Sequence, residues 1–192
     1  MYGKLVRLRP VELDDQKFLT ELNSDPSVRS NVVGWSFPQS EHWQTEWFRT
    51  SKPTDSHRWI VDVGDESPIG MTGLWDVDWH NRHAKTALKI GGPRNQRGKG
   101  FGRDAIKAVM AFAFYDVGLQ RLHTTILEDN IPSLRAYQTH CNWKIEGVAR
   151  SHVWRHGDFK NLLHLGVLRE EFDALPDAEE YVAMVRNGPP VR

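Results

Sequence analysis

The sequence predicts an α+β fold of three layers, in which helices flank a central mixed sheet of six or seven mostly antiparallel strands. Three observations point to this fold. Strand-like segments between residues 59 and 90 are joined by short polar turns, as in an antiparallel meander. A long amphipathic helix pattern follows them, and a second helix pattern separates the strand-like segments nearer the C-terminus.

The chain begins with a strand and a helix. Residues 5–8 alternate apolar and basic side chains and stop at Pro10, which predicts a short strand. An apolar stripe over residues 12–23 predicts a helix that ends before a Ser-Asp-Pro breaker.

Residues 27–58 are less regular. Within them, residues 41–48 predict a short helix with Trp43 and Trp47 on one face. The strands of the meander are predicted next, at residues 59–63, 70–79 and 84–90.

The clearest helix follows a glycine-rich segment at residues 94–102. Its apolar side chains recur three or four residues apart and form one sustained stripe: Ile106, Val109, Met110, Ala113, Phe114 and Val117. We expect the helix to end at Gly118, because glycine is the preferred residue after a helix C-terminus.

The C-terminal third returns to strands. They are predicted at residues 122–127, 144–153 and 161–168. Between the first two, Pro132 suits the first turn of a helix that runs to about His140. We therefore expect one domain over residues 4–172, followed by an acidic, partly helical tail over residues 173–192.

Composition excludes several classes of protein. With 25 basic and 25 acidic residues, the chain has no net charge to attract nucleic acid or an anionic membrane. No apolar run approaches the roughly 20 residues that span a bilayer, and charges occupy the place of a signal peptide's apolar stretch. The lone Cys141 excludes an intramolecular disulfide and fits a reducing compartment, so we expect a cytoplasmic protein.

The glycine-rich segment predicts an anion cradle. Three glycines alternate with other residues directly before the strong helix, and four cations flank or separate them. Such a backbone turns successive amides toward one concavity at the positive end of the helix, as a diphosphate requires. The spacing fits neither a P-loop, because Gly100 follows Lys99, nor a dinucleotide or kinase loop, which needs two residues before its last glycine.

Two motifs together resemble those of the GNAT N-acetyltransferase superfamily. The pattern Arg97-x-x-Gly100-x-Gly102, opening a helix after a meander, resembles its acetyl-CoA loop. The stretch from Asn130 through Ser133 to Tyr137 resembles its Asn-x-x-Ser/Ala-x-x-x-Tyr element. The resemblance covers residues 4–172, and the closing strands look like those of the ribosomal-protein-alanine and polyamine acetyltransferase branch.

The resemblance implies an acetyl-CoA-dependent N-acetyltransferase. A primary amine, on a small molecule or a protein N-terminus, would attack the thioester directly in a ternary complex. Tyr137 would protonate the leaving thiolate, because a phenol keeps its proton at neutral pH. Alternatively, Tyr137 is a helix residue that packs on the sheet.

The resemblance also implies the groups that bind the coenzyme: Leu88, Lys89, Ile90, Arg94, Arg97, Gly98, Lys99, Gly100, Phe101, Gly102, Asn130 and Ser133. The strand at residues 88–90 would separate from its neighbour and offer main-chain groups to the pantetheine arm. The cations could instead form a solvated basic face, and Asn130 could cap a helix, which is compatible with binding.

One departure from the family concerns the general base. Many relatives carry a Glu on the fourth strand, where this chain has the stretch 84–88 without a carboxylate. The substitutes that could act through a water are Asp76, Asp78, His80, His83 and Glu128. The missing carboxylate also motivates an alternative, an acyl-CoA-binding regulatory protein with weak or no transferase activity.

Other residues permit two interpretations. His80 with His83, and His152 with His156, have metal-binding spacing, but surface histidines are favoured and no metal is expected. Several tryptophans could line an acceptor pocket or serve as core and interface anchors: Trp35, Trp43, Trp47, Trp75 and Trp79. The family needs no nucleophilic cysteine, and a homodimer is an expectation from this branch.

Overall fold

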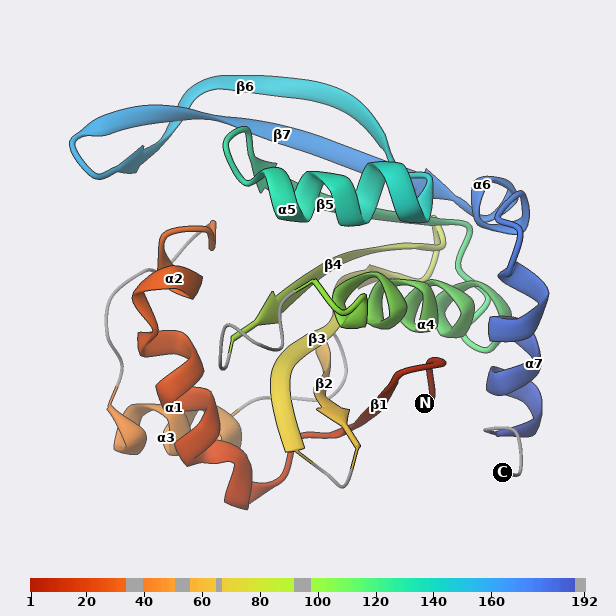
Figure 1. Cartoon of the computed structure of the whole chain (residues 1–192), viewed down its shortest axis with the longest axis horizontal. Helices are drawn as coiled ribbons and strands as arrows, with labels where there is room; N and C mark the ends of the chain where they lie inside the picture. Colours follow the sequence, from red (N-terminus) through yellow and green to blue (C-terminus); the bar gives the residue numbers. More distant parts are fainter. Residues whose placement is uncertain (34–39, 51–55, 65–66, 92–97, 189–192) are drawn as a thin grey trace.

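A computed structural model of the chain describes residues 1–33, 40–50, 56–64, 67–91 and 98–188. Its centre is a seven-stranded sheet with the strand order β1-β2-β3-β4-β5-β7-β6 (Figure 1). The strands are β1 (Val6–Pro10), β2 (Ser56–Val63), β3 (Ser67–Asp78), β4 (His83–Ile90), β5 (Arg121–Leu127), β6 (Lys144–Arg155) and β7 (Asp158–Leu168). The mixed, mostly antiparallel sheet expected from the sequence is confirmed.

Only one neighbouring pair of strands in this sheet is parallel. Strands β1 to β4 form the antiparallel meander, and β5, β7 and β6 pair antiparallel in that order. The parallel pair is β4 with β5, and its register covers only His83↔Arg121, Ala84↔Leu122 and Lys85↔His123. Beyond Lys85 the two strands separate, so the sheet is split at its middle.

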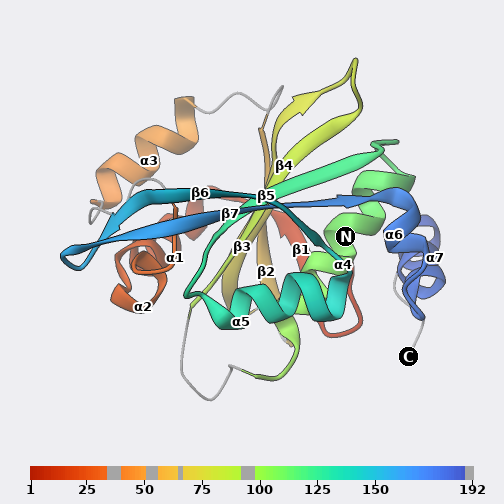
Figure 2. The same ribbon diagram turned by 90° about the horizontal axis from the view of Figure 1, so that it is seen from above.

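Helices cover both faces of the sheet (Figure 2). One group comprises α1 (Gln16–Ser24), α2 (Pro26–Arg29) and α3 (Glu41–Thr50). The other comprises α4 (Phe101–Tyr115), α5 (Ile131–Leu134), α6 (Arg169–Asp173) and α7 (Ala178–Asn187). Two apolar cores follow from the alternation of strand side chains, since Ile60 packs with α1 while Val61 belongs to the larger core around α4.

Helix α4 is the most buried helix. Its apolar stripe is covered from Ile106 to Phe114, and Phe114 tilts against Phe172 with ring centroids 5.8 Å apart. The helix ends at Tyr115 rather than at Gly118, so Val117 lies beyond it and is half-buried. The helix begins after Gly100, whose φ of 89° lies in the left-handed region that favours glycine. This fixes the direction in which α4 leaves the glycine-rich segment.

The strands β6 and β7 form a long hairpin that extends past α5 toward α2 (Figures 1 and 2). The guanidinium of Arg155 donates from Nη2 to the carbonyl of Val32, at 2.6 Å. Leu127, Val153 and Leu162 form a small core beneath the hairpin, and Val33 packs on it. The hairpin therefore closes one side of the space between α2 and β5.

The C-terminal segment is helical and packs on the domain. Helix α7 packs against α4 and runs across it rather than along it (Figure 1), and Ala178, Tyr181 and Met184 are buried in the larger core. The boundary that the sequence suggests after residue 172 thus separates two segments that share one core.

Two helices differ in detail from the sequence-based expectation. The helix predicted for residues 12–23 starts with a 3₁₀ turn, Leu13–Asp15, before α1. The helix predicted from Pro132 to His140 is α5 followed by the π-helical turn η3 (Arg135–Thr139). Within the described residues, no helix is long and apolar enough to cross a membrane.

Candidate active site

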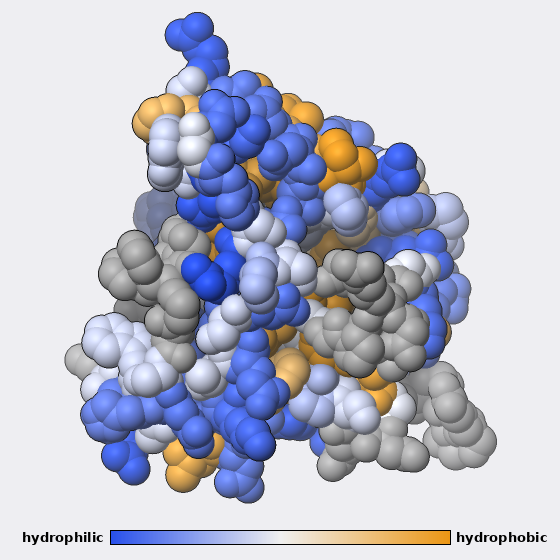
Figure 3. Space-filling view, turned by 60° about the vertical axis from the view of Figure 1, so that its left-hand side comes forward, coloured by the Kyte–Doolittle hydropathy of each residue, from blue (hydrophilic) through white to orange (hydrophobic). Residues whose placement is uncertain are grey.

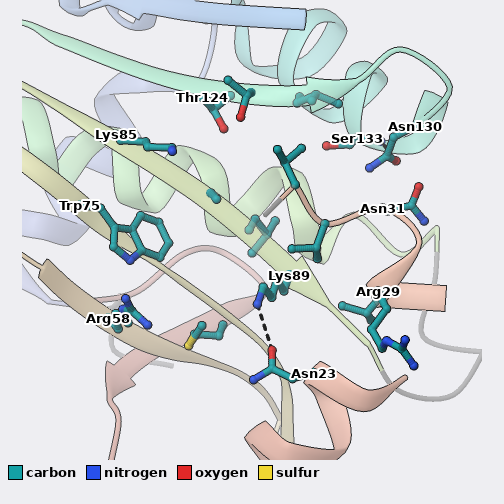
Figure 4. Close-up of a pocket in the computed structure, with 18 of the residues that line it drawn as sticks. Asn23, Arg29, Asn31, Arg58, Trp75, Lys85, Lys89, Thr124, Asn130 and Ser133 are labelled. Atoms are coloured by element: carbon teal, nitrogen blue, oxygen red, sulfur yellow. Dashed lines mark hydrogen bonds between the residues drawn. The ribbon is translucent and has the colours of Figure 1, made fainter. Parts of the chain in front are cut away.

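A cavity of about 500 Å³ lies where β4 and β5 separate (Figure 4). Its walls come from the strands β2, β3, β4 and β5, from the helices α1, α2, α3 and α5, and from the π-helical turn η3. Met71 and Val28 of the core near α1 line it, and so does Tyr137 of the core near α4. The cavity thus reaches both sides of the sheet through the split.

The split leaves part of β4 without a partner on the β5 side. Strand β3 pairs with β4 as far as Ile90, whereas β5 pairs with β4 only to Lys85. The main-chain groups of residues 86–90 that face β5 therefore have no strand partner. This is the polar edge that an extended chain with amide groups requires.

The glycine-rich segment lies at the N-terminus of α4. Gly98 and Gly100 have φ values of 77° and 89°. A Cβ at Gly100 would lie 3.0 Å from Nε of Arg103, so a side chain there would meet both strain and crowding. Arg94 and Arg97 lie outside the described residues, whereas Lys99, Phe101 and Gly102 continue the segment into α4.

Asn130 and Ser133 lie at one end of the cavity, at the start of α5 (Figure 4). The side-chain oxygen of Asn130 accepts a hydrogen bond from the main-chain N–H of Ser133, at 3.3 Å. Asn130 therefore caps α5, which is the structural role that the sequence left open. It also lines the cavity, so capping and ligand binding are compatible.

Tyr137 is on the π-helical turn η3 and lines the cavity, although its side chain is only 3% exposed. Its ring packs edge-on against Trp143, with centroids 5.0 Å apart. Burial raises the pKa of Tyr137, while a hydrogen bond with Thr124 acts in the opposite direction. The phenol therefore holds its proton throughout the physiological range. Such single π turns often occur at functional sites.

The opposite end of the cavity is cationic and aromatic. The Arg58 guanidinium carbon lies 4.4 Å from the centre of the Trp47 ring and 5.5 Å from that of Trp75. Nζ of Lys89 donates to Oδ1 of Asn23 at 2.9 Å (Figure 4). Burial lowers the pKa of both Arg58 and Lys89, and the charge of Arg58 lowers that of Lys89 further.

Of the five substitutes for the missing strand carboxylate, only Asp76 is among the described residues that line the cavity. Asp78 accepts two hydrogen bonds from Asn81, and Glu128 accepts two from Asn161. His80 and His83 lie outside the lining. His83 stacks edge-on with His123, with ring centroids 5.7 Å apart. Asp76 is exposed, at the irregularity where the β3–β4 register shifts.

The tryptophans considered for an acceptor pocket differ in whether they line the cavity. Trp43, Trp47 and Trp75 line the cavity, Trp79 is outside its lining, and Trp35 lies outside the described residues. Burial raises the pKa of the Cys141 thiol to about 12, so it stays protonated and is a poor nucleophile. Across the described ranges, no three His, Cys, Asp or Glu side chains gather as a metal site would require.

The cationic end of the cavity is not predicted by the sequence motifs. Arg58, Asn23 and the side chain of Lys89 were not predicted to share a cavity, because they come from β2, α1 and β4. The one available signal was alternation. In β2, Arg58 occupies the same face as the buried Ile60, where an apolar residue would be expected.

The chain also matches a known family. Residues 6–140, more than half of its length, match the model of the acetyltransferase (GNAT) domain. The chain is a GNAT acetyltransferase. The resemblance drawn from its two motifs is thereby confirmed, and the chain uses acetyl-CoA to acetylate an amine.

The similar proteins are N-acetyltransferases matched over most of their length. An uncharacterized N-acetyltransferase of the SPbeta prophage of Bacillus subtilis, YokL, is 28% identical over 89% of this GNAT chain and 94% of the relative. Spermidine N(1)-acetyltransferase of Vibrio cholerae is 20% identical over 86% and 94%. A crystal structure of spermidine N-acetyltransferase from Vibrio cholerae in complex with CoA and spermine superposes with a TM-score of 0.80, at 19% identity over 88% and 99%.

The residues present fit acetyl-CoA. The strand edge over residues 86–90, unpaired on the β5 side, suits the amides of the pantetheine arm. The left-handed glycines at the start of α4 suit the diphosphate. Bound there, acetyl-CoA supplies an activated acetyl group.

Proposed function

We propose that this GNAT acetyltransferase transfers the acetyl group to a primary amine by direct attack in a ternary complex, with Tyr137 as the general acid. One observation carries the proposal: the Tyr137 side chain lines a cavity that crosses the sheet between β4 and β5. A donor along the split and an acceptor from the α1–α3 side can therefore meet beside this phenol. The coenzyme ligands named from the sequence remain part of the proposal.

The chain's own groups perform three tasks. The main-chain groups of residues 86–90 and the cap residues Asn130 and Ser133 hold and orient the donor. The sheet and the surrounding aromatic rings exclude water, which strengthens each polar contact inside the cavity. Tyr137 holds a proton in this buried place, ready for the sulfur that leaves as the amide bond forms.

Asp76 is the group we propose to take the proton of the attacking ammonium, directly or through a water. Asp76→Asn should lower kcat/KM at neutral pH by about 10-fold to 100-fold. Because more acceptor is deprotonated at higher pH, the loss should shrink by pH 9. Rates of thiol release against pH measure this. Asp158→Asn, at an exposed hairpin carboxylate, is the control, and an equal, pH-independent loss in both variants would contradict the role.

The pH profile tests Tyr137 independently of mutation. A raised pKa keeps the protonated form of an acid present to higher pH. We therefore expect kcat to rise with deprotonation of the acceptor and to stay level up to about pH 10, near the usual pKa of an exposed tyrosine. Stopped-assay measurements between pH 6 and pH 10 at saturating substrates suffice. A fall in kcat near pH 9 with the protein still folded would contradict a buried phenol as the acid.

We propose a small primary amine as the acceptor. A protein N-terminus is the other candidate. The names of the relatives support a small amine, since three of them are spermidine N(1)-acetyltransferases. Thiol release measured with acetyl-CoA and a panel of small amines and short peptides distinguishes the two. Peptides as the only acceptors would contradict a small-molecule enzyme.

The regulatory alternative is motivated by the absence of a carboxylate from residues 84–88. It is the weaker candidate, because Asp76 reaches the cavity from β3. Calorimetric binding of acetyl-CoA without thiol release from any amine would favour it.

We also propose a cytoplasmic homodimer that does not bind nucleic acid. The reducing compartment is supported by the single, buried Cys141, and the lack of nucleic-acid affinity is supported by the neutral net charge.

The dimer is supported by an exposed aromatic pair on the β6–β7 hairpin. The rings of Trp154 and Phe159 lie edge to face there, with centroids 4.9 Å apart, and could form an interface between copies. Sedimentation at micromolar concentration should give twice the 22.1 kDa chain mass, and a monomer would refute the dimer.

A further inference from the structure

The charge of the cavity does not suit a polycation. Among the described residues that line it, Arg29, Arg58, Lys85 and Lys89 are cationic, and Asp76 is the single carboxylate. Arg58, Lys85 and Trp75 lie together at the end opposite Asn130 and Ser133 (Figure 4). A polyamine placed there would meet more positive than negative charge. The face of the molecule that carries α1–α3 is mostly hydrophilic, with hydrophobic residues scattered among polar ones (Figure 3).

Two of these cations are held in fixed positions. Trp47 and Trp75 pack against the Arg58 guanidinium, and Nε of Arg58 donates to Oγ of Ser56 at 3.2 Å. Lys89 is anchored to Asn23, whose own amide donates to the buried Gln44 at 3.1 Å. Cation–π contacts and a hydrogen bond to a neutral amide orient a cation without cancelling its charge.

No carboxylate of the described residues forms an ion pair with Arg58 or Lys89, in contrast to Arg9, which pairs with both Asp15 and Asp62. Burying a cation without an anionic partner costs free energy. The two cations also repel each other, and this repulsion by Arg58 helps to lower the pKa of Lys89. A ligand that brings an oxyanion would remove that cost.

Coenzyme A is the wrong source for this anion. Its diphosphate fits the left-handed glycines before α4, and α4 packs on the opposite side of the sheet from α1. Arg58 contacts Trp47 of α3 and Lys89 contacts Asn23 of α1, so both point to the face that α4 does not cover. The anion must therefore belong to the acceptor.

We propose that the acceptor is a small primary amine that also carries an oxyanion, either a carboxylate or a phosphate. Arg58 and Lys89 bind the oxyanion, and the amine lies toward Asp76. The inference rests on the proposed acetyl transfer and adds the chemical class of its substrate. Arg58 is suited to this task, because its planar guanidinium presents paired donors that match the two oxygens of a carboxylate or a phosphate.

The first test compares matched amines by thiol release from acetyl-CoA. Each of a set of amino acids is compared with its amide, which lacks the carboxylate. In the same way, 2-aminoethyl phosphate is compared with ethanolamine, which lacks the phosphate, and spermidine is assayed in parallel. We expect the best acceptor to carry an anion and to exceed its neutral partner at least about 10-fold in kcat/KM. The carboxylate and phosphate arms show which oxyanion is used. Spermidine or a neutral amine as the best acceptor would overturn the inference while leaving acetyl transfer intact.

The second test changes the cations. Arg58→Gln and Lys89→Gln should each lower the ratio of kcat/KM for the anionic amine over its neutral partner by about 10-fold or more. Arg58→Lys should recover part of that ratio. Arg49→Gln, an exposed cation of α3 outside the cavity, is the matched control and should leave the ratio unchanged. An unchanged ratio in both cavity variants would refute the assignment.

A binding measurement separates this inference from the proposed function. If no amine releases thiol, the proposed acetyl transfer fails, and calorimetry of the same amines on the CoA-loaded protein decides the inference alone. Binding of an anionic amine that is tighter than that of its neutral partner, and that weakens in Lys89→Gln, supports the site. Equal binding of the two partners contradicts it. Circular dichroism of each variant confirms that the fold is intact.

Discussion

Replacing Tyr137 with Phe should lower kcat by about 100-fold or more and leave the affinity for acetyl-CoA nearly unchanged. The change removes only the hydroxyl group. The ring keeps its edge-on packing against Trp143, so the cavity wall retains its shape. Single-turnover thiol release gives the rate of the chemical step, and calorimetry with CoA gives the affinity.

Tyr115→Phe is the matched control for this experiment. Its hydroxyl donates to Asp173 at 2.6 Å on the surface, and it does not line the cavity. This variant should turn over at the wild-type rate. A Tyr137→Phe enzyme as fast as the control would show that the acid is another group or a water.

Asp104→Ala should lower the free energy of unfolding by about 3–5 kcal/mol. The Asp104 carboxylate is 2% exposed. It accepts hydrogen bonds from three consecutive main-chain N–H groups of residues 4–6 and from the hydroxyl of Tyr181. This one side chain therefore joins the segment before β1, helix α4 and helix α7. Alanine would leave these buried donors without an acceptor.

Thermal and urea unfolding measure the effect of Asp104→Ala. A domain of this size loses roughly 2–4 °C in Tm per kcal/mol, so the shift should be on the order of 10 °C. Asp173→Ala is the control, because that carboxylate is half exposed and accepts from a surface tyrosine. We expect about 1 kcal/mol or less for it. Equal losses in the two variants would mean that Asp104 does not connect the three segments.

The sequence predicted the elements that depend on local pattern. Strand-like segments joined by short polar turns located β2, β3 and β4, and the apolar stripe located α4. The boundaries of the elements depend on features outside these patterns. Helix α4 starts at Phe101, earlier than the stripe suggests, since the left-handed Gly100 rather than an apolar residue determines its first turn.

The split in the sheet was predicted only through the family resemblance. A parallel pair that stops after Lys85 joins segments more than thirty residues apart, and no local pattern encodes that distance. The π-helical turn at Tyr137 was also missed. Its sequence reads as an ordinary helix, and the change in hydrogen bonding depends on packing against α4.

The sequence predicts a set of residues for the donor side and only a few alternatives for the acceptor side. The glycines before α4 and the spacing from Asn130 to Tyr137 form motifs of fixed length along the chain. Such motifs can be found in a sequence without knowledge of the fold. Asp76 was one of five substitutes, and only its place in the cavity distinguishes it. Arg58 and Lys89 were not assigned to the acceptor, because charged residues in strands usually face solvent and their common cavity is a property of the folded chain.

We propose that the split between β4 and β5 brings the thioester beside Tyr137. A crystal structure with CoA and an acceptor amine decides this. We expect the CoA sulfur within about 3.5 Å of the Tyr137 hydroxyl, with the pantetheine arm hydrogen-bonded to the main chain of residues 86–90. A coenzyme bound outside the split, with its sulfur too far from Tyr137 for a hydrogen bond, would contradict it.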